Sequence, residues 1–185
     1  MSDIQVRHQV TGVATLKLKY GTSERKISIG LFGQLAPVQA QAFRQLCQSQ
    51  AMMKRQNSNV PLQSASKSLR GATIYKYNPD FGFWFGDVQN IIETPVKSEQ
   101  AKLDHFQYCL TSFGSDANVL SNVFVLVSAQ KVEYLNEKHV VFGQLMDSES
   151  VQVAEELKKF VVVEGCDRVS ENSEVLITEV QFEEK

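Results

Sequence analysis

The sequence predicts a mainly β domain, in which antiparallel strands form a barrel and two separated helices complete an α+β architecture. The strands are indicated by short segments of alternating polar and apolar residues, and by short apolar runs bounded by Ser, Asn or Gly. The helices are indicated by two segments, one in each half of the chain, with apolar residues three and four positions apart. The 185 residues suffice for a single domain over residues 1–185, with two domains as the less favoured alternative.

The predicted elements begin with a hairpin. Residues 15–20 alternate between polar and apolar side chains, residues 21–23 form a turn, and residues 26–29 form the return strand. A helix is predicted over residues 38–48, because Pro37 suits its start and apolar residues share one of its faces. These apolar residues are Ala36, Ala40, Phe43 and Cys47.

Further strands are predicted in the middle of the chain. Residues 72–85 are rich in aromatic side chains, and Pro79 and Asp80 divide them into two strands around a turn. The apolar residues 119–127, bounded by Ser and Asn, predict a buried strand, and residues 140–145 predict another.

A second helix and a closing strand complete the predicted fold. Ser148 or Ser150 is expected to cap the helix. The apolar side chains of this helix that face inwards are Val153, Ala154, Leu157 and Phe160. The closing strand contains Val175, Ile177, Val180 and Phe182.

A long loop is predicted over about residues 48–70, where the chain is rich in Ser, Gln and Asn and contains Pro61. We expect this loop to be mobile, and removable with little change in thermal stability, because the free energy of loop closure depends weakly on length. Loops of this length are often functional, and a tolerated insertion is an equally favoured alternative.

Composition excludes several protein classes. No apolar run approaches the ~18–20 residues of a membrane span, and the N-terminus does not resemble a signal peptide. The three cysteines are odd in number and form no Cys-x-x-Cys motif, which predicts free thiols in a reducing compartment. We therefore expect the cytoplasm, with the nucleus as an alternative. The three histidines are far apart in the sequence, so no metal site is predicted.

Charge is distributed unevenly along the chain. Residues 25–79 contain eight basic residues and no acidic one, whereas residues 145–185 contain eleven acidic residues and four basic ones. The basic region could form a surface for nucleic acid or an acidic partner. The alternative, that the two regions neutralise each other across the fold, is favoured because the pI is only 5.9.

The sequence contains no phosphate-binding glycine loop and no nucleophile motif of the hydrolytic enzymes. Four other segments carry a recognisable pattern, and they occur in a defined order along the chain. They are Ile29-Gly30-Leu31-Phe32 with Ala36-Pro37 and Ala42-Phe43-Arg44-Gln45-Leu46-Cys47; Gly71-Ala72-Thr73-Ile74-Tyr75-Lys76-Tyr77-Asn78-Pro79-Asp80-Phe81 up to Gly86-Asp87; Ser121-Asn122-Val123-Phe124-Val125; and Tyr134-Leu135-Asn136-Glu137-Lys138-His139-Val140-Val141-Phe142-Gly143.

This pattern resembles the cyclophilin family of peptidyl-prolyl cis–trans isomerases over roughly residues 14–182. The resemblance implies a closed antiparallel eight-stranded barrel that is capped at each end by an α-helix. It also implies rotation of X-Pro bonds, over a barrier of ~18–20 kcal/mol, without metal or cofactor. In the family a hydrophobic pocket holds the proline, and an arginine donates a hydrogen bond that favours the twisted amide.

The resemblance assigns the substrate site position by position. The residues that agree with the family fall on the proline pocket and are Phe81, Phe124, Leu135 and His139. The residues that depart from it are Lys76 in place of the catalytic arginine, Tyr75 in place of a histidine, Gly82 in place of a methionine, Trp84 in place of a glutamine, and Tyr134 in place of a tryptophan that often contacts cyclosporin. Phe113 lies near the family's Ala-Asn pair.

These departures leave three functional hypotheses. The first is an isomerase of proline-containing peptides or proteins with a weak active site, because Lys76 lacks the planar donor fork of arginine. The second is an inactive peptide-binding module, because the bulky Trp84 can fill the pocket itself. The third is an interaction protein of an RNA-processing or other nuclear assembly. We further expect a monomer with weak cyclosporin binding and no membrane association.

Overall fold

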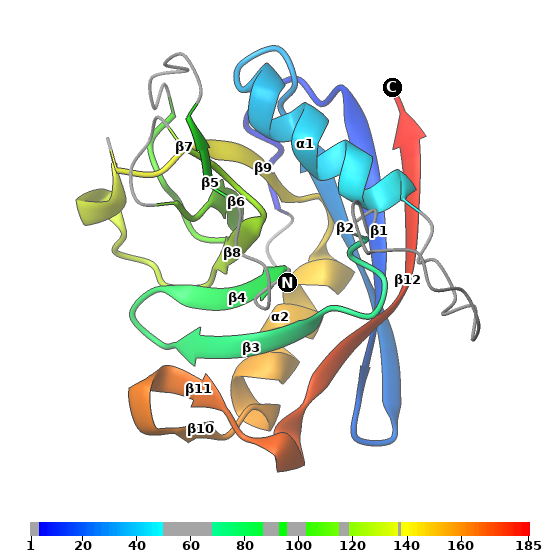
Figure 1. Ribbon diagram of the computed structural model, residues 1–185, viewed down its shortest axis with the longest axis vertical. Coiled ribbons are helices and arrows are strands. Elements are labelled where there is room, and N and C mark those ends of the chain that lie inside the picture. The colour runs from blue at the N-terminus through cyan, green and yellow to red at the C-terminus, as the bar shows by residue number, and fades with distance from the viewer. Residues whose placement is uncertain (1–3, 50–67, 87–92, 96–102, 115–118, 137) are drawn as a thin grey trace, which may run out of the picture.

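The structure is a computed structural model that describes residues 4–49, 68–86, 93–95, 103–114, 119–136 and 138–185. Eight strands form a closed antiparallel barrel in the order β3-β12-β1-β2-β9-β6-β8-β4, and the pairing of β4 with β3 closes it (Figure 1). The predicted barrel is therefore confirmed. The strands are β1 (Gly12–Tyr20), β2 (Ser23–Leu31), β3 (Thr73–Asn78), β4 (Gly82–Gly86), β6 (Cys109–Ser112), β8 (Val123–Val127), β9 (Val141–Leu145) and β12 (Val175–Glu184).

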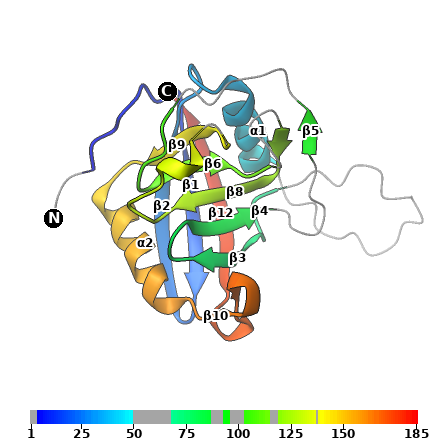
Figure 2. The ribbon, with the colours of Figure 1, turned by 90° about the vertical axis from the view of Figure 1, so that its left-hand side faces the viewer.

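Two helices cover the barrel from different sides. Helix α1 (Pro37–Gln48) contacts β12 and β9, whereas α2 (Ser148–Phe160) contacts β2. Figure 1 shows α1 at the upper end and α2 at the lower end, and Figure 2 shows the same separation after a quarter turn.

Smaller elements surround the barrel. Strands β10 (Val163–Glu164) and β11 (Arg168–Val169) form a short hairpin that continues the sheet beside β3. Strand β5 (Glu93–Pro95) pairs with β7 (Val119–Ser121). The 3-10 turns are η1 (Glu133–Leu135), η2 (Gly165–Asp167) and η3 (Glu171–Ser173).

The first helix forms as its sequence predicts. Pro37 is its first residue, where the missing N–H costs no intrahelical hydrogen bond. The predicted apolar face is buried in the main core, which also contains the inward residues of β1 and β2. Phe43 is central to this core, because its ring meets the rings of Phe85, Phe124 and Phe142.

The cap of the second helix differs from the prediction. Asp147 is the capping residue, and its carboxylate accepts a hydrogen bond from the Ser150 backbone N–H at 2.7 Å. Ser148 is the first helical residue, and the Ser150 hydroxyl accepts from the Ser28 backbone N–H at 2.8 Å. Both serine and aspartate satisfy the geometry of a cap, so spacing alone does not select between neighbouring candidates.

The predicted apolar strand over residues 119–127 is divided into β7 and β8 at Asn122. Strand β6 was not predicted, because its four residues, Cys-Leu-Thr-Ser, are too few to show a period. All four are buried, since β6 lies between β8 and β9 in the sheet.

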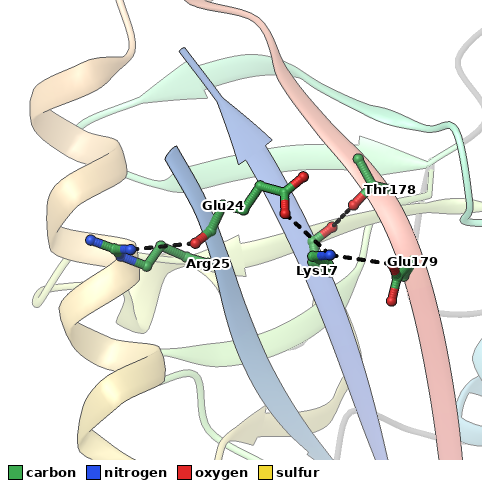
Figure 3. Close-up of polar contacts among 5 residues, drawn as sticks. All are labelled: Lys17, Glu24, Arg25, Thr178 and Glu179. Carbon is green, nitrogen blue, oxygen red and sulfur yellow. Dashed lines mark hydrogen bonds and ion pairs between the residues drawn. The ribbon is translucent and has the colours of Figure 1, made fainter. Parts of the chain in front are cut away.

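Charged side chains hold neighbouring strands together on the outer surface. The ammonium of Lys17 on β1 lies between the carboxylates of Glu24 on β2 (3.1 Å) and Glu179 on β12 (3.3 Å) (Figure 3). These two carboxylates raise the pKa of Lys17. Thr178 also donates from its hydroxyl to the Lys17 carbonyl at 3.2 Å, so three strands are tied at one point.

The uneven charge of the sequence is partly neutralised in the fold. Bases from the acid-free region form ion pairs with acids of the C-terminal region, as the favoured alternative predicts. The pairs are Arg25 with Glu156 (3.5 Å), Arg44 with Glu184, and Lys76 with Asp167 (3.8 Å).

Most of the predicted loop, residues 50–67, lies outside the described residues. At its end, however, Leu69 is buried in the main core, and its backbone N–H donates to the Leu46 carbonyl at 3.2 Å. Residues 68–72 form no helix or strand, but Leu69 packs with the barrel and is therefore not a removable part of the loop. A test of the removable loop has to retain Leu69.

The thiols of Cys47, Cys109 and Cys166 are all free, as the cysteine count predicts. Burial raises the pKa of the Cys47 and Cys109 thiols to about 12. Neither α1 nor α2 has the length and apolar character that crossing a membrane requires.

Candidate active site

The hairpin of β3 and β4 carries the basic residue of the candidate site. A bulge interrupts the pairing of these strands between Ile74 and Lys76. Ile74 and Tyr77 both pack in the main core. Tyr75 packs against the small outer cluster that contains Trp84, and Lys76 places its ammonium over the Trp84 ring. The extra residue of a bulge lets two neighbours share one face of a strand. Tyr75 and Lys76 therefore both lie beside Trp84.

Five predicted residues form a continuous group of rings, called here the aromatic cluster: Phe81, Trp84, Phe113, Tyr134 and His139. The Phe81 ring lies 4.6 Å from the Trp84 ring and 6.3 Å from the Tyr134 ring, measured between centroids. Phe113 bridges the other side, at 5.6 Å from Trp84 and 4.9 Å from His139, on which it stacks. Three separate parts of the chain meet here, and the surface they form is apolar and aromatic.

Trp84 points into the aromatic cluster. Its neighbours Phe83 and Phe85 face the core, so alternation along β4 turns Trp84 outwards. Its side chain is only 4% exposed, and its indole N–H is buried without a hydrogen-bond partner among the described residues. A buried donor without a partner costs about 1–3 kcal/mol. The indole thus offers an unused donor within the aromatic cluster.

Lys76 stands between two groups that attract its charge. Its ammonium lies 4.9 Å from the centroid of the Trp84 ring, a cation–π distance, and 3.8 Å from the Asp167 carboxylate. More than a third of the Lys76 side chain is exposed, so the ammonium remains accessible to a peptide on the surface.

The turn η1 and the residues after it hold the far side of the aromatic cluster. The Tyr134 hydroxyl donates to the Asp80 carbonyl at 2.8 Å, which fixes the ring although it is 52% exposed. Leu135 is buried in a second core cluster against which Phe81 packs, so Leu135 supports Phe81 from the interior. The His139 backbone N–H donates to the Leu135 carbonyl at 3.3 Å.

A buried histidine lies behind His139. The His105 ring is 6.5 Å from the His139 ring, and its two nitrogens lie 3.0 Å from Asn136 Oδ1 and 3.1 Å from Thr111 Oγ1. Asn136 Oδ1 also accepts from the His105 backbone N–H at 2.7 Å. This network anchors the chain between Tyr134 and His139.

Burial determines the ionisation of both histidines. It lowers the pKa of His139 to about 4, and the charges of His105 and Lys138 add to the effect. Burial also lowers the pKa of His105, against the opposing effects of the Asn136 hydrogen bond and the Asp104 charge. Both rings are therefore neutral at pH 7 and do not compete with Lys76 as cations.

We expect His139 to titrate near pH 4 when its ring nitrogens are followed by NMR. Because this pKa lies below the unfolded value of about 6.5, the unfolded chain binds more protons between these pH values. The contribution of His139 to stability is thus present above pH 6.5 and is lost as pH falls from 6.5 towards 4. Urea midpoints should accordingly fall less with acidification in His139→Gln than in the wild type. A His139 midpoint near pH 6.5 would contradict the burial seen here.

Phe124 is a correction to the predicted site. Its side chain is fully buried in the main core against Phe43, Phe85 and Phe142, on the opposite face of β8 from Trp84. Val125, one residue later, packs against Trp84 instead. A shift of one residue along a strand moves a side chain to the other face, and the uniformly apolar β8 shows no alternation that would reveal the face.

Gly82 contributes backbone rather than a side chain. It is buried at the contact of β4 with β8, where a Cβ would lie 2.2 Å from the Leu126 carbonyl oxygen. Only glycine permits this approach of the two strands. The predicted role of Gly82 in substrate binding is thus limited to the shape of the strand beneath the aromatic cluster.

Asp167 was not predicted to belong to the site, although it is the acidic partner of Lys76. The only signal in the sequence was the general excess of acids after residue 145. No group of three His, Cys, Asp or Glu side chains suited to a metal ion occurs in the described ranges.

Comparison with known proteins agrees with this geometry. The model of the family described as cyclophilin type peptidyl-prolyl cis-trans isomerase/CLD matches residues 15–181. The curated peptidyl-prolyl cis-trans isomerase 11 of Caenorhabditis elegans is 24% identical over 152 residues, which cover 77% of this chain and 78% of that protein. With the closed barrel, its two helices and the aromatic cluster beside the hairpin of β3 and β4, the match over nearly the whole chain shows that the protein belongs to the cyclophilin-type peptidyl-prolyl cis–trans isomerase family.

Proposed function

We propose that this chain binds X-Pro segments on the aromatic cluster and rotates the prolyl bond slowly, with Lys76 as the hydrogen-bond donor. The observation that supports the proposal is the position of the Lys76 ammonium over the Trp84 ring, beside the aromatic surface that would receive a proline. Rotation requires the amide to lose its double-bond character, and a cationic donor near the prolyl nitrogen favours that twisted state. The roles of Lys76, Tyr75, Phe81, Trp84, Phe113, Tyr134, Leu135 and His139 are part of this proposal.

We expect the exchange rate of an Ala-Pro peptide, measured by exchange NMR, to be well below that of family members with the arginine. Lysine offers a point charge on a flexible stem, whereas arginine presents a rigid planar fork. Lys76→Arg alone should raise the rate only partly, because Trp84 has an indole N–H donor but lacks the acceptor oxygen of a glutamine amide. Full recovery in this single variant, or a typical rate in the wild type, would show that these departures are unimportant.

A second candidate function is peptide binding without turnover, and the position of Trp84 favours it. The indole occupies part of the surface where a substrate-holding amide is usual, and it packs on Phe81 at 4.6 Å. In that case the Ala-Pro peptide would shift the amide resonances of Phe81 and Phe113 without accelerating exchange between its cis and trans forms.

Cyclosporin should bind weakly, with a dissociation constant of roughly 1 μM or more, which corresponds to about −8 kcal/mol or weaker. The Tyr134 hydroxyl is already engaged with the Asp80 carbonyl, and a phenol does not present the N–H of an indole. Calorimetry on the wild type and on Tyr134→Trp tests this, and the variant should bind more tightly. Nanomolar affinity in the wild type would contradict the expectation.

Further properties are proposed from the charges and thiols. Three ion pairs neutralise basic residues of the region 25–79, which had been considered as a surface for nucleic acid. This neutralisation supports a protein rather than an RNA partner. A salt titration with single-stranded RNA separates the two, because phosphate binding weakens steeply as salt rises.

Buried free thiols support a reducing compartment, the cytoplasm or nucleus. We propose that the protein is a monomer in solution, and analytical ultracentrifugation measures its oligomeric state directly.

A further inference from the structure

A short hairpin outside the barrel approaches the functional residue Lys76. Strand β11 lies beside β3 (Figure 1). It pairs with β3 at a single position, Arg168 opposite Lys76. The preceding turn, η2, therefore ends beside β3, on the edge of that strand opposite to β4.

The carboxylate of Asp167, at the end of η2, connects two side chains of β3. Its Oδ2 accepts a hydrogen bond from the Asn78 amide at 2.9 Å and lies 3.8 Å from the Lys76 ammonium. The same ammonium lies over the Trp84 ring on the neighbouring strand β4. Asp167 and Trp84 thus hold the ammonium from the two sides of β3.

The backbone of η2, which carries this carboxylate, adopts an uncommon conformation. Cys166 and Asp167 both lie in the left-handed region, with φ of 62° and 60°. This region is unfavourable for residues with a side chain, although aspartate tolerates it better than most. Strain of this kind persists where the surrounding structure demands it, often at functional sites.

We propose that Asp167 is a positioning residue that fixes the Lys76 ammonium for the rotation step. The proposal rests on the proposed function of Lys76. A lysine stem loses rotamer entropy when its end is fixed, and it lacks the pre-organised plane of arginine. The Asp167 carboxylate, which is held by Asn78, therefore restricts the position of the Lys76 ammonium. In an arginine, the rigid plane of the guanidinium group would provide part of this restriction.

Asp167→Asn tests this role, because the amide oxygen can still accept from Asn78 while the charge is removed. For a half-exposed ion pair, we expect kcat to fall roughly two- to fivefold. KM should change little, since the donor acts mainly in the transition state. Glu164→Gln, which removes an exposed charge from β10 of the same hairpin, is the matched control and should keep the wild-type rate.

A double-mutant cycle with Lys76→Met separates positioning from a structural role. If Asp167 acts through Lys76, Asp167→Asn lowers kcat in the wild type and has no effect in the Lys76→Met chain. An equal decrease in both backgrounds, an unchanged rate in the wild-type background, or an increase would overturn the proposal.

Fluorescence provides a readout that does not depend on turnover, because Trp84 is the only tryptophan of the chain. Release of Lys76 by Asp167→Asn should change the Trp84 emission, and the change should be absent in the Lys76→Met background. A wild type without exchange activity would refute the proposed function alone, and the fluorescence cycle would still decide the positioning. Emission that Asp167→Asn leaves unchanged, or changes equally in both backgrounds, would refute the positioning.

Discussion

Lys76→Met is expected to lower kcat/KM for an Ala-Pro peptide by roughly ten- to a hundredfold, measured by exchange NMR. Removal of a single well-placed donor from an enzyme site costs about 10²–10³ in rate, and a flexible lysine should contribute towards the lower end. Methionine keeps the length and apolar stem of the side chain, so packing on Trp84 is largely retained while the charge is lost.

The matched control is Lys26→Met, which removes an exposed lysine of β2, three strands away from β3 around the barrel. This variant should isomerise at the wild-type rate. If both variants behave alike, the contribution of Lys76 is a general effect of charge, and the rotation step depends on the aromatic cluster alone.

The contact between Lys76 and its partners shows why the fold was more predictable than the site. The hairpin of β1 and β2 and the two helices follow from periods of two and about four residues, which local sequence displays directly. The placement of Tyr75 and Lys76 on one face depends on a bulge in β3. A bulge changes the alternation without a fixed sequence signature, so simple alternation misplaces the residues after it.

Asp167 illustrates a second limit. It reaches Lys76 only because β11 pairs with β3 at one position and because η2 takes a left-handed backbone. Both are tertiary features, and the sequence around Lys76 predicts neither of them. The resemblance to a family named the replaced arginine, but it assigned no acidic partner to the lysine that replaces it.

Phe124→Ala is expected to lower the free energy of unfolding by about 3–5 kcal/mol, the usual cost of truncating a buried phenylalanine. Its ring is fully buried among Phe43, Phe85 and Phe142, so the substitution leaves a cavity in the main core. Domains of this kind have about 5–15 kcal/mol of stability in total, so this single change is severe. Chemical denaturation measures it.

Phe124→Leu is the companion variant that should stay folded, with a loss of about 1–2 kcal/mol. Peptide affinity of the folded Phe124→Leu protein should equal that of the wild type, because Phe124 faces away from Trp84. Phe81→Leu should behave in the opposite way, since Phe81 is only partly buried and touches Trp84 and Tyr134. It should weaken peptide binding with a smaller loss of stability. If Phe124→Leu instead weakens binding while the unfolding free energy stays constant, then β8 turns Phe124 towards the peptide, and the assignment of Val125 to that face is wrong.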